Sequence, residues 1–364
     1  MQRRKFLAGA GMGSAAALAS LSAHAQSGLP TLNWRLTSGF PKSLDTLYGN
    51  AEYIARRIGE LTDGKFQIKV FAAGEIVPSL QVLDSVQNGT VEMGQVPLYW
   101  FFGKNPAFAF GTAVPFGMTA RQQFAWWHQA GGLTMYREFM KGFNVYNLPC
   151  ANTGTQMGGW FRKEIKSVAD LKGLKFRVGG VAGVILQKLG VVPQQIAPGD
   201  IYPALEKGVI DAAEWVGPHD DERLGLSKVA KFYYYPGWWE GGAESHALVN
   251  LAKWNELPKF YQLAIEVACN EAYWMTQAKY DAVNPVALKR LVAAGGQLRP
   301  FPRAVMEACE KAAYETYAEF GQKSAEWKKI YEPWKKFRDE QFTWFRVAEN
   351  TYENYMYQSK IGRG

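Results

Sequence analysis

The chain has 364 residues, 41 basic and 33 acidic, with a formal net charge of +8. Without the three basic residues near its N-terminus the balance is 38 to 33, or +5, and the charges alternate in sign along the chain. This pattern gives no support to a nucleic-acid-binding protein. The length fits two domains, each large enough for a core of its own.

Residues 1–25 have the form of an export signal. Arg3, Arg4 and Lys5 precede an apolar run of small residues that ends at 23–25, Ala-His-Ala. The wording RRKFL is similar to a twin-arginine signal, although ordinary secretory signals also carry paired arginines. No later apolar run reaches the roughly 20 residues of a membrane helix. We therefore expect a soluble protein in the periplasm.

The cysteines favour neither a disulfide framework nor a zinc site. Cys150, Cys269 and Cys309 are an odd number and show no Cys-x-x-Cys spacing. We expect them to be small buried apolar residues.

The first elements predict an α/β fold. Residues 34–40 and 66–74 read as strands with a helix between them. The stretch LDSVQNGTVEMG then resembles ALEKGVIDAA: each predicts a helix, a glycine (Gly89 or Gly208) and a short strand. Glycine fits the left-handed position that ends a helix. Two related units indicate two lobes.

These patterns divide the chain into two lobes and a tail. We assign residues 27–150 and 250–302 to the first lobe, 151–249 to the second lobe, and 303–364 to a C-terminal helical tail. A long helix predicted at 258–280 would cross back to the first lobe and produce a hinge.

The tail is predicted to be helical, with a break at Pro333. Apolar and aromatic residues recur at spacings of three and four along one face, and two more lie off it. This surface predicts either a homodimer interface or a helix packed on its own lobe. The residues on the face are Phe337, Gln341, Phe345, Ala348, Tyr352 and Tyr355, and those off it are Phe342 and Trp344.

Three stretches rich in glycine and aromatic residues carry the candidate ligand site. Arg177 lies in GLKFRVGG, Glu214 and Trp215 lie in GVIDAAEWVGP, and Glu240 lies in FYYYPGWWEGG. Each stretch is a strand-like run closed by turn residues, and side chains at strand ends are well placed to meet ligands.

Arg177 is the candidate anion ligand. Its planar guanidinium can hold a carboxylate through two hydrogen bonds, which a lysine cannot do. The alternative is a structural ion pair with a neighbouring acid. Gly179 and Gly180 favour ligand binding because they leave space beside the strand.

Glu214 and Glu240 would repel each other if both were buried and ionised in one pocket, and a cation between them would relieve that cost. Two unrelated surface acids are the alternative. A remote alternative is an exported carbohydrate-active enzyme that uses the pair as acid and base. Little else supports an enzyme, because His219, in GPHDDE, reads as an exposed turn residue and no catalytic histidine setting is visible.

Several longer stretches resemble one family, the DctP-type substrate-binding receptors of tripartite ATP-independent periplasmic (TRAP) transporters, and in particular their α-keto acid branch. The resemblance extends from Trp34 into the tail. It implies a two-lobe venus-flytrap fold and a receptor that delivers its ligand to TRAP membrane subunits, without enzymatic activity. The stretches are NTGTQMGGWF, GLKFRVGG, GVVPQQIA, GDIYPALEKGVIDAAEWVGP and FYYYPGWWEGG.

The resemblance also implies roles for individual residues. Arg177 would pair with the ligand carboxylate, and a sodium ion would bind Gln156, Glu214, the backbone carbonyl of Trp215, and Glu240. These oxygen ligands suit Na⁺ or Ca²⁺. Two glutamates, one arginine and a monoanion sum to −2, which Na⁺ changes to −1 and Ca²⁺ to zero, so calcium stays open.

The pocket wall sets the expected ligand. Tyr99, Trp100 and Trp215 are the candidates for this wall, with ordinary core packing as the alternative. PLYWFFGKNP replaces a tyrosine-rich run of the α-keto acid receptors, so the ligand's substituents stay open. We expect a 2-oxo monocarboxylate such as pyruvate, and lactate or another hydroxy acid or dicarboxylate with calcium is the alternative. A receptor for an ATP-driven importer would share the fold.

Overall fold

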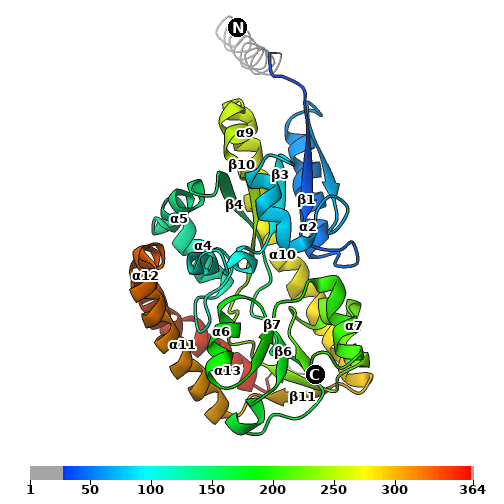
Figure 1. Ribbon diagram of the computed structural model, residues 1–364, viewed down its shortest axis with the longest axis vertical. Helices are drawn as coiled ribbons and strands as arrows, with labels where there is room; N and C mark the ends of the chain where they lie inside the picture. The colour runs from blue at the N-terminus through cyan, green and yellow to red at the C-terminus, as the bar shows by residue number, and fades with distance from the viewer. Residues whose placement is uncertain (1–27, 362–364) are drawn as a thin grey trace, which may run out of the picture.

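The computed structural model describes residues 28–361 and shows two sheets, one above the other, joined by a long helix, α10 (Lys259–Ala293) (Figure 1). The α/β two-lobe fold expected from the sequence is confirmed. The predicted export signal lies outside the described residues.

The first sheet has the strand order β2-β1-β3-β10-β4. Strand β1 runs parallel to β2 and β3, whereas β10 runs antiparallel to β3 and β4. Alternate residues of β1, including Trp34 and Leu36, are buried, and α2 (Leu47–Leu61) packs Ile54 and Ile58 into the same core. The strands are β1 (Leu32–Ser38), β2 (Phe66–Phe71), β3 (Met93–Val96), β4 (Val145–Asn152) and β10 (Glu244–Asn250).

The second sheet has the order β11-β9-β5-β8-β6-β7. Helix α6 (Gly180–Lys188) follows β6, and α8 (Pro218–Arg223) follows β8. His219, expected on an exposed turn, lies in α8 and is only 8% exposed because the helix packs against α10. The strands are β5 (Gly159–Phe161), β6 (Lys175–Arg177), β7 (Val192–Gln194), β8 (Ala212–Ala213), β9 (Phe232–Tyr235) and β11 (Gln297–Pro300).

The two related helix-glycine-strand units have the same hydrogen bonds. Gly89 (φ 72°) follows α3 (Val82–Gln87), and Gly208 (φ 71°) follows α7 (Ile201–Glu206). The amide of Gly89 donates to Val86 (3.1 Å), and the amide of Gly208 donates to Leu205 (3.2 Å). The left-handed turn predicted at each glycine is therefore confirmed.

The sheets divide the chain differently from the predicted domains at two places. Strand β10 starts at residue 244 and belongs to the first sheet, although residues 151–249 were assigned to the second lobe. Strand β11 belongs to the second sheet, although 250–302 were assigned to the first. The placement of β11 follows from α10, which continues past the predicted end at 280 through Pro285 and carries the chain back to the second sheet.

The tail consists of α11 (Arg303–Lys323), α12 (Ala325–Val347) and α13 (Glu349–Gln358). It breaks at Ser324 and Ala348 and not at Pro333, which lies inside α12. Ser324 starts the new helix because its side chain accepts a hydrogen bond from the Trp327 amide (3.1 Å). Trp327 then packs on Phe110 of the first lobe, with ring centroids 4.6 Å apart.

The tail contacts both lobes, since α11 packs on α6 and α12 packs on α4 and α5. Helix α13 has no buried residue. The remaining elements are α4 (Ala120–Gln129), α5 (Gly132–Lys141), α9 (Leu251–Glu256) and the 3-10 turns η1 (Ser79–Gln81), η2 (Leu98–Phe101), η3 (Pro106–Gly111), η4 (Val168–Leu171), η5 (Pro198–Asp200) and η6 (Leu226–Lys228).

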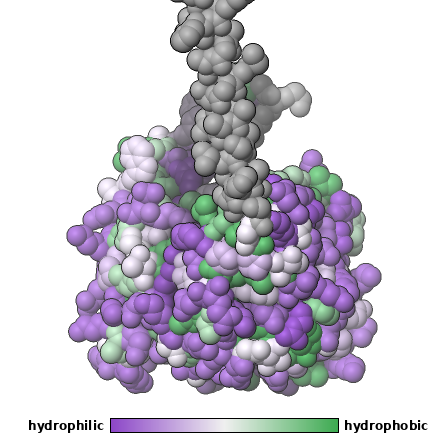
Figure 2. All heavy atoms as spheres, turned by 90° about the horizontal axis from the view of Figure 1, so that it is seen from above, coloured by the Kyte–Doolittle hydropathy of each residue, from purple (hydrophilic) through white to green (hydrophobic). Residues whose placement is uncertain are grey.

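All three cysteines are buried and unpaired, as the sequence predicts. Among residues 28–361, no helix combines the length and the apolar character needed to cross a membrane. On the face of the first lobe seen in Figure 2, hydrophilic residues predominate and apolar residues are scattered between them.

Candidate functional site

A narrow cavity lies between the two sheets. The first lobe and the second lobe both line it, and so do the two segments that cross between the sheets, 153–158 and 236–243, with the start of β10. A ligand in this cavity would therefore contact both lobes and the two segments that connect them. Its lining residues are Phe40, Leu47, Pro97, Tyr99, Trp100, Thr153, Gln156, Trp215, Val216, Ala243, Glu244 and Ser245.

Arg177, the last residue of β6, is fully buried beside this cavity. Its Nη1 donates to the backbone carbonyl (2.6 Å) and to Oε1 (2.5 Å) of Glu214, and its Nε donates to the Ile196 carbonyl (3.3 Å). The guanidinium carbon lies 5.0 Å from the centre of the Trp215 ring. Its Nη2 has no hydrogen-bond partner among residues 28–361. Two of the three guanidinium nitrogens are thus engaged, and Nη2 can bind a ligand.

Glu214 is held by one carboxylate oxygen. Its Oε1 accepts from Arg177 and from the Gly179 amide (3.0 Å), while Oε2 is buried without a partner in the described part of the chain. Burial raises the pKa of Glu214, and the charge of Arg177 opposes that rise. The structural ion pair considered as an alternative for Arg177 is therefore present, and it leaves a donor and an acceptor for a ligand.

Gln156 and Glu240 lie side by side on the two crossing segments. The backbone amide of Gln156 donates to the backbone carbonyl of Glu240 (3.1 Å), and the side-chain Nε2 of Gln156 donates to Thr153 Oγ1 (3.0 Å). Gln156 Oε1 and Glu240 Oε2 are buried and find no partner within residues 28–361. The pKa of Glu240 is raised well above its usual range by burial and by the charge of Glu214, against a hydrogen bond from Tyr99.

Besides Trp215, whose indole Nε1 is also buried without a partner, four of the predicted site residues each leave one buried polar atom without a partner in the described part of the chain. A buried, unpaired polar group costs about 1–3 kcal/mol, and a charged one costs more. Three of these atoms are oxygens and one is a guanidinium nitrogen, so a cation and an anion together would satisfy all four. The atoms are Gln156 Oε1, Glu214 Oε2, Glu240 Oε2 and Arg177 Nη2.

These donors fit a hard cation. Among the described residues no group of three or more histidines, cysteines or acids could hold a metal ion. The candidate set has only two carboxylates, so an amide oxygen and a carbonyl must complete it. This composition suits Na⁺ or Ca²⁺ and not a metal that prefers sulfur or nitrogen. The Trp215 indole lines the cavity, and cation binding by its backbone carbonyl stays a prediction.

Tyr99 and Trp100 lie in η2 and line the cavity from the first lobe. The space beside Gly179 and Gly180, which the sequence suggested for the ligand, is taken by the Tyr99 ring. A Cβ at Gly179 would lie 2.7 Å from Tyr99 Oη, and one at Gly180 would lie 2.3 Å from Tyr99 Cδ2. The two glycines therefore allow the Tyr99 ring of the first lobe to pack directly against the backbone of the second lobe.

Sequence reasoning missed several lining residues. Phe40 follows strand β1 and packs against Trp100 and Trp215, with ring centroids 5.6 and 6.2 Å away. Its place at a strand end, before a proline, is a signal that could have found it. Glu244 carried no such signal in the sequence. In the structure, burial raises the pKa of Glu244 to about 8, and its carboxylate accepts a hydrogen bond from the Trp127 indole (2.5 Å).

The comparisons with known proteins agree with this geometry. Residues 37–324 match the family described as bacterial extracellular solute-binding protein, family 7 (DctP). The chain is 52% identical over 335 residues to the monocarboxylate 2-oxoacid-binding periplasmic protein of Nostoc sp., covering 92% of each protein.

Two solved structures are similar over most of the chain. A TRAP transporter solute-binding protein from Bordetella bronchiseptica matches with a TM-score of 0.89 and 53% identity, over 90% of this chain and 98% of that one. It is a dimer of mixed occupancy, with copurified calcium and picolinate in one site and the other site empty. A second, a TRAP periplasmic solute-binding protein from Pseudoalteromonas atlantica with bound sodium and pyruvate, matches with a TM-score of 0.86 and 36% identity, over 89% of this chain and 99% of that one. The chain therefore belongs to the DctP family of TRAP solute-binding proteins.

Proposed function

We propose that this protein is a periplasmic receptor that closes on a 2-oxo monocarboxylate of the pyruvate type together with Na⁺ or Ca²⁺, and delivers it to the membrane subunits of a TRAP transporter. The observation that carries the proposal is the set of four buried polar atoms left without partners on Arg177, Gln156, Glu214 and Glu240.

Each residue has a role in this proposal. Arg177 Nη2 donates to the ligand carboxylate, while Nη1 stays bound to Glu214. Gln156, Glu214 and Glu240 supply side-chain oxygens to the cation, and Trp215 supplies its carbonyl. A 2-oxo acid can chelate the same cation through a carboxylate oxygen and its keto oxygen. The ligand then links both charges, and neither is left buried alone.

The relatives support this ligand class. Pyruvate carries an acceptor oxygen on the carbon next to its carboxylate, and picolinate carries a ring nitrogen in the equivalent place. Both can chelate a cation with the same five-membered geometry. Their aromatic and small aliphatic bodies also suit a wall formed by Phe40, Trp100 and Trp215.

The calcium alternative follows from charge. Two ionised glutamates, Arg177 and a monoanion sum to −2, which calcium cancels and sodium does not. A lactate or another hydroxy-acid receptor with calcium is therefore the second candidate, and it differs only in the oxygen that completes the chelate. In both cases Arg177 and the Gly179 amide fix one oxygen of Glu214, and the other oxygen is proposed to bind the cation.

Calorimetric titration of the metal-stripped protein tests the proposal. Pyruvate, 2-oxobutyrate, lactate and succinate are each titrated in sodium, calcium and potassium buffers. We expect 2-oxo acids to bind in sodium or calcium and not in potassium, which is too large for the site that fits the smaller ions. Lactate binding in calcium alone favours the second candidate. Release of a reaction product from any of these acids would contradict the receptor role.

We further propose a homodimer formed through the tail. Trp344, Val347, Tyr352 and Tyr355 are between 58% and 68% exposed, and no residue of α13 is buried. An apolar surface of this kind on a helix end fits a second copy of the chain. Deleting residues 349–364 should convert a dimer to a monomer in analytical ultracentrifugation and leave pyruvate affinity within about twofold. A full-length protein that sediments as a monomer at all concentrations would contradict the dimer.

A further inference from the structure

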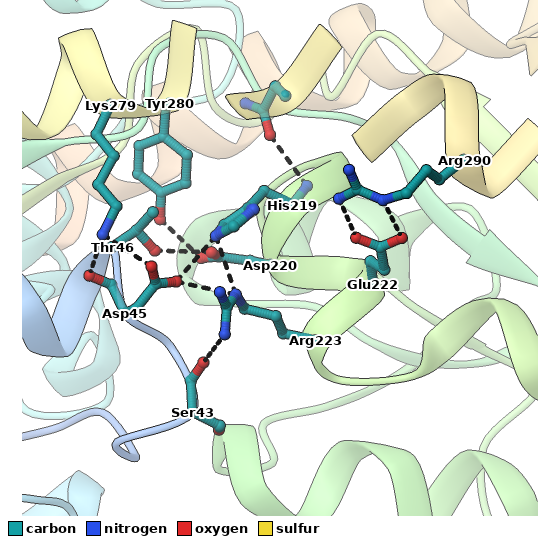
Figure 3. A network of polar contacts seen from close by, with 11 residues as sticks. Ser43, Asp45, Thr46, His219, Asp220, Glu222, Arg223, Lys279, Tyr280 and Arg290 are labelled. Atoms are coloured by element: carbon teal, nitrogen blue, oxygen red, sulfur yellow. Dashed lines mark hydrogen bonds and ion pairs between the residues drawn. The ribbon is translucent and has the colours of Figure 1, made fainter. Parts of the chain in front are cut away.

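Two chain segments line the ligand cavity. Polar side chains of the same two segments also contact each other (Figure 3). Residues 40–47 belong to the first lobe and 214–223 to the second. The first segment contributes Phe40 and Leu47 to the cavity, and the second contributes Trp215 and Val216. Between and beyond these lining residues, the same segments carry polar side chains that bond across the gap. Any movement of the cavity walls must therefore move these bonds.

Asp45 is the centre of the polar contacts on the first lobe. Its Oδ1 lies 2.9 Å from Nε2 of His219 and 2.9 Å from Nε of Arg223, both on α8 of the second lobe. Its Oδ2 lies 2.9 Å from Nζ of Lys279 on α10. Burial raises the pKa of Asp45, but these hydrogen bonds and the charges of Lys279 and Arg223 outweigh it and leave the pKa lowered. The carboxylate is thus held ionised between three partners.

A second contact is buried. Thr46 Oγ1 donates to Asp220 Oδ1 (2.7 Å), while the Tyr280 hydroxyl donates to Asp220 Oδ2 (2.7 Å). Asp220 is fully buried, and its hydrogen bond to Thr46 crosses from one lobe to the other. If the lobes separate, one oxygen of this carboxylate loses its donor and must find water instead. The contact therefore favours the closed arrangement.

We propose that Asp45, Thr46, His219, Asp220 and Arg223 form an interlobe latch, which engages when the lobes close over the ligand and slows ligand release without touching the ligand. The mechanism is a population shift. A contact made only in the closed form lowers the free energy of that form and so raises the apparent affinity for anything that binds there. The ligand readout of this proposal rests on the proposed function.

The expected size of the effect follows from burial. Asp45 is 38% exposed and Arg223 41%, so water and salt screen their ion pair. The contact between Thr46 and Asp220 is buried and less screened. We expect the loss of either contact to raise the dissociation rate about 3- to 10-fold, with the association rate changed less than about twofold.

Stopped-flow measurement of pyruvate release tests the latch with two variants, Asp45→Asn and Thr46→Val. Both keep the shape of the side chain. Asp45→Asn removes the charge that pairs with Arg223 and Lys279, and Thr46→Val removes the donor to Asp220. Glu222→Gln is the matched control, because Glu222 lies on the same helix but pairs with Arg290 of α10 (2.5 Å) and makes no described contact with residues 40–47. Faster release in the two variants and not in the control is expected. Unchanged release in both variants would overturn the latch.

A disulfide tests the same idea without any ligand. Thr46 and Asp220 meet through their side chains, so cysteines are placed at the two positions and oxidised, and thiol titration establishes that the disulfide has formed. The native cysteines are buried and at most 1% exposed, so they do not compete. Small-angle X-ray scattering then compares the oxidised and reduced Thr46→Cys/Asp220→Cys protein without ligand.

If these segments separate when the lobes open, oxidation should give a more compact scattering profile. Identical profiles would show that the segments stay together in the open form, which would refute the latch and leave a static brace. Failure of the proposed function looks different: the wild-type protein would bind no 2-oxo acid, while the scattering comparison would still decide on the latch.

Discussion

The two sets of fully buried acids in this protein differ in their partners. Glu214 and Glu240, beside the cavity, each leave one carboxylate oxygen without a hydrogen-bond partner among the described residues. Asp220, Asp221 and Glu244 have both oxygens satisfied by tyrosine, tryptophan or threonine side chains or by a backbone amide.

The difference lies in the hydrogen-bond partners and not in contact with the cavity, because Glu244 also lines the cavity. Burial raises the pKa of every one of these acids, so a raised pKa alone does not identify the ligand site. The unpaired carboxylate oxygens of Glu214 and Glu240 do, because leaving them buried without a ligand costs free energy that a bound cation would recover.

Removing the ligand's anion partner should have the largest effect. Arg177→Lys keeps a positive charge beside Glu214 but loses the unpaired Nη2 donor. Pyruvate affinity should fall about 100-fold, because charge-assisted hydrogen bonds contribute about 1.5–3 kcal/mol each. Calorimetry measures the affinity, and thermal unfolding controls for damage to the buried ion pair. An affinity within threefold of wild type would remove Arg177 from the site.

The two sets should respond in opposite ways to amide substitution. Glu240→Gln removes a buried charge that lacks a partner, so we expect the ligand-free protein to unfold at the same or a higher temperature while cation-dependent affinity falls about 10- to 50-fold. The matched variant is Asp221→Asn, which should cost about 1–3 kcal/mol of unfolding free energy and leave affinity within about twofold. If Asp221→Asn weakened binding as much as Glu240→Gln, the comparison would fail.

Stability should depend on pH through Glu244. Its pKa is raised to about 8 in the folded protein, so the unfolded chain releases this proton at lower pH than the folded one. The folded state then binds more protons, and the unfolding free energy falls as pH rises toward 8. His246, with its pKa lowered to about 3, acts in the opposite direction below its unfolded value.

Above pH 6.5 His246 no longer contributes, but Asp221, whose pKa is raised to about 7, titrates in the same range as Glu244. The contribution of Glu244 is therefore the difference between wild type and Glu244→Gln. We expect about 1 kcal/mol of stability to be lost between pH 6.5 and 7.5, and Glu244→Gln to remove that part of the slope. Urea unfolding at both pH values, for wild type and variant, measures it. Parallel slopes in the two proteins would mean that Glu244 is already ionised in the fold.

The smallest change in pyruvate affinity should come from a substitution in the first lobe, Tyr99→Phe. Tyr99→Phe removes the hydroxyl that bonds to Glu240 and keeps the ring that packs on Gly179 and Gly180. We expect pyruvate affinity to fall about 2- to 5-fold, consistent with one neutral hydrogen bond donated to a charged group. Calorimetry in sodium buffer measures it. A loss as large as that of Arg177→Lys would place Tyr99 in direct contact with the ligand.

Much of the fold follows from local sequence patterns. The turns at Gly89 and Gly208 depend on residues next to each other in the chain, and so does the strand that ends at Arg177. The path of α10 does not, because its extension through Pro285 depends on packing against both lobes. The same limit applies to Pro333, which stays inside a helix anchored by Trp327 and Trp334.

Local sequence patterns likewise predict only part of the candidate site. Strand-end residues such as Arg177 and Glu214 carry their own signal. Tyr99 against Gly179, and Asp45 against His219, are contacts between lobes that no local pattern encodes. Residues whose role depends on lobe closure therefore had to come from the structure.

A crystal structure with pyruvate and calcium tests the central claim most directly, since anomalous scattering locates the calcium. The claim predicts calcium bound to Gln156, Glu214, Glu240 and the Trp215 carbonyl, with the pyruvate carboxylate on Arg177. Calcium bound elsewhere, or a carboxylate that leaves Arg177 Nη2 without a partner, would contradict it.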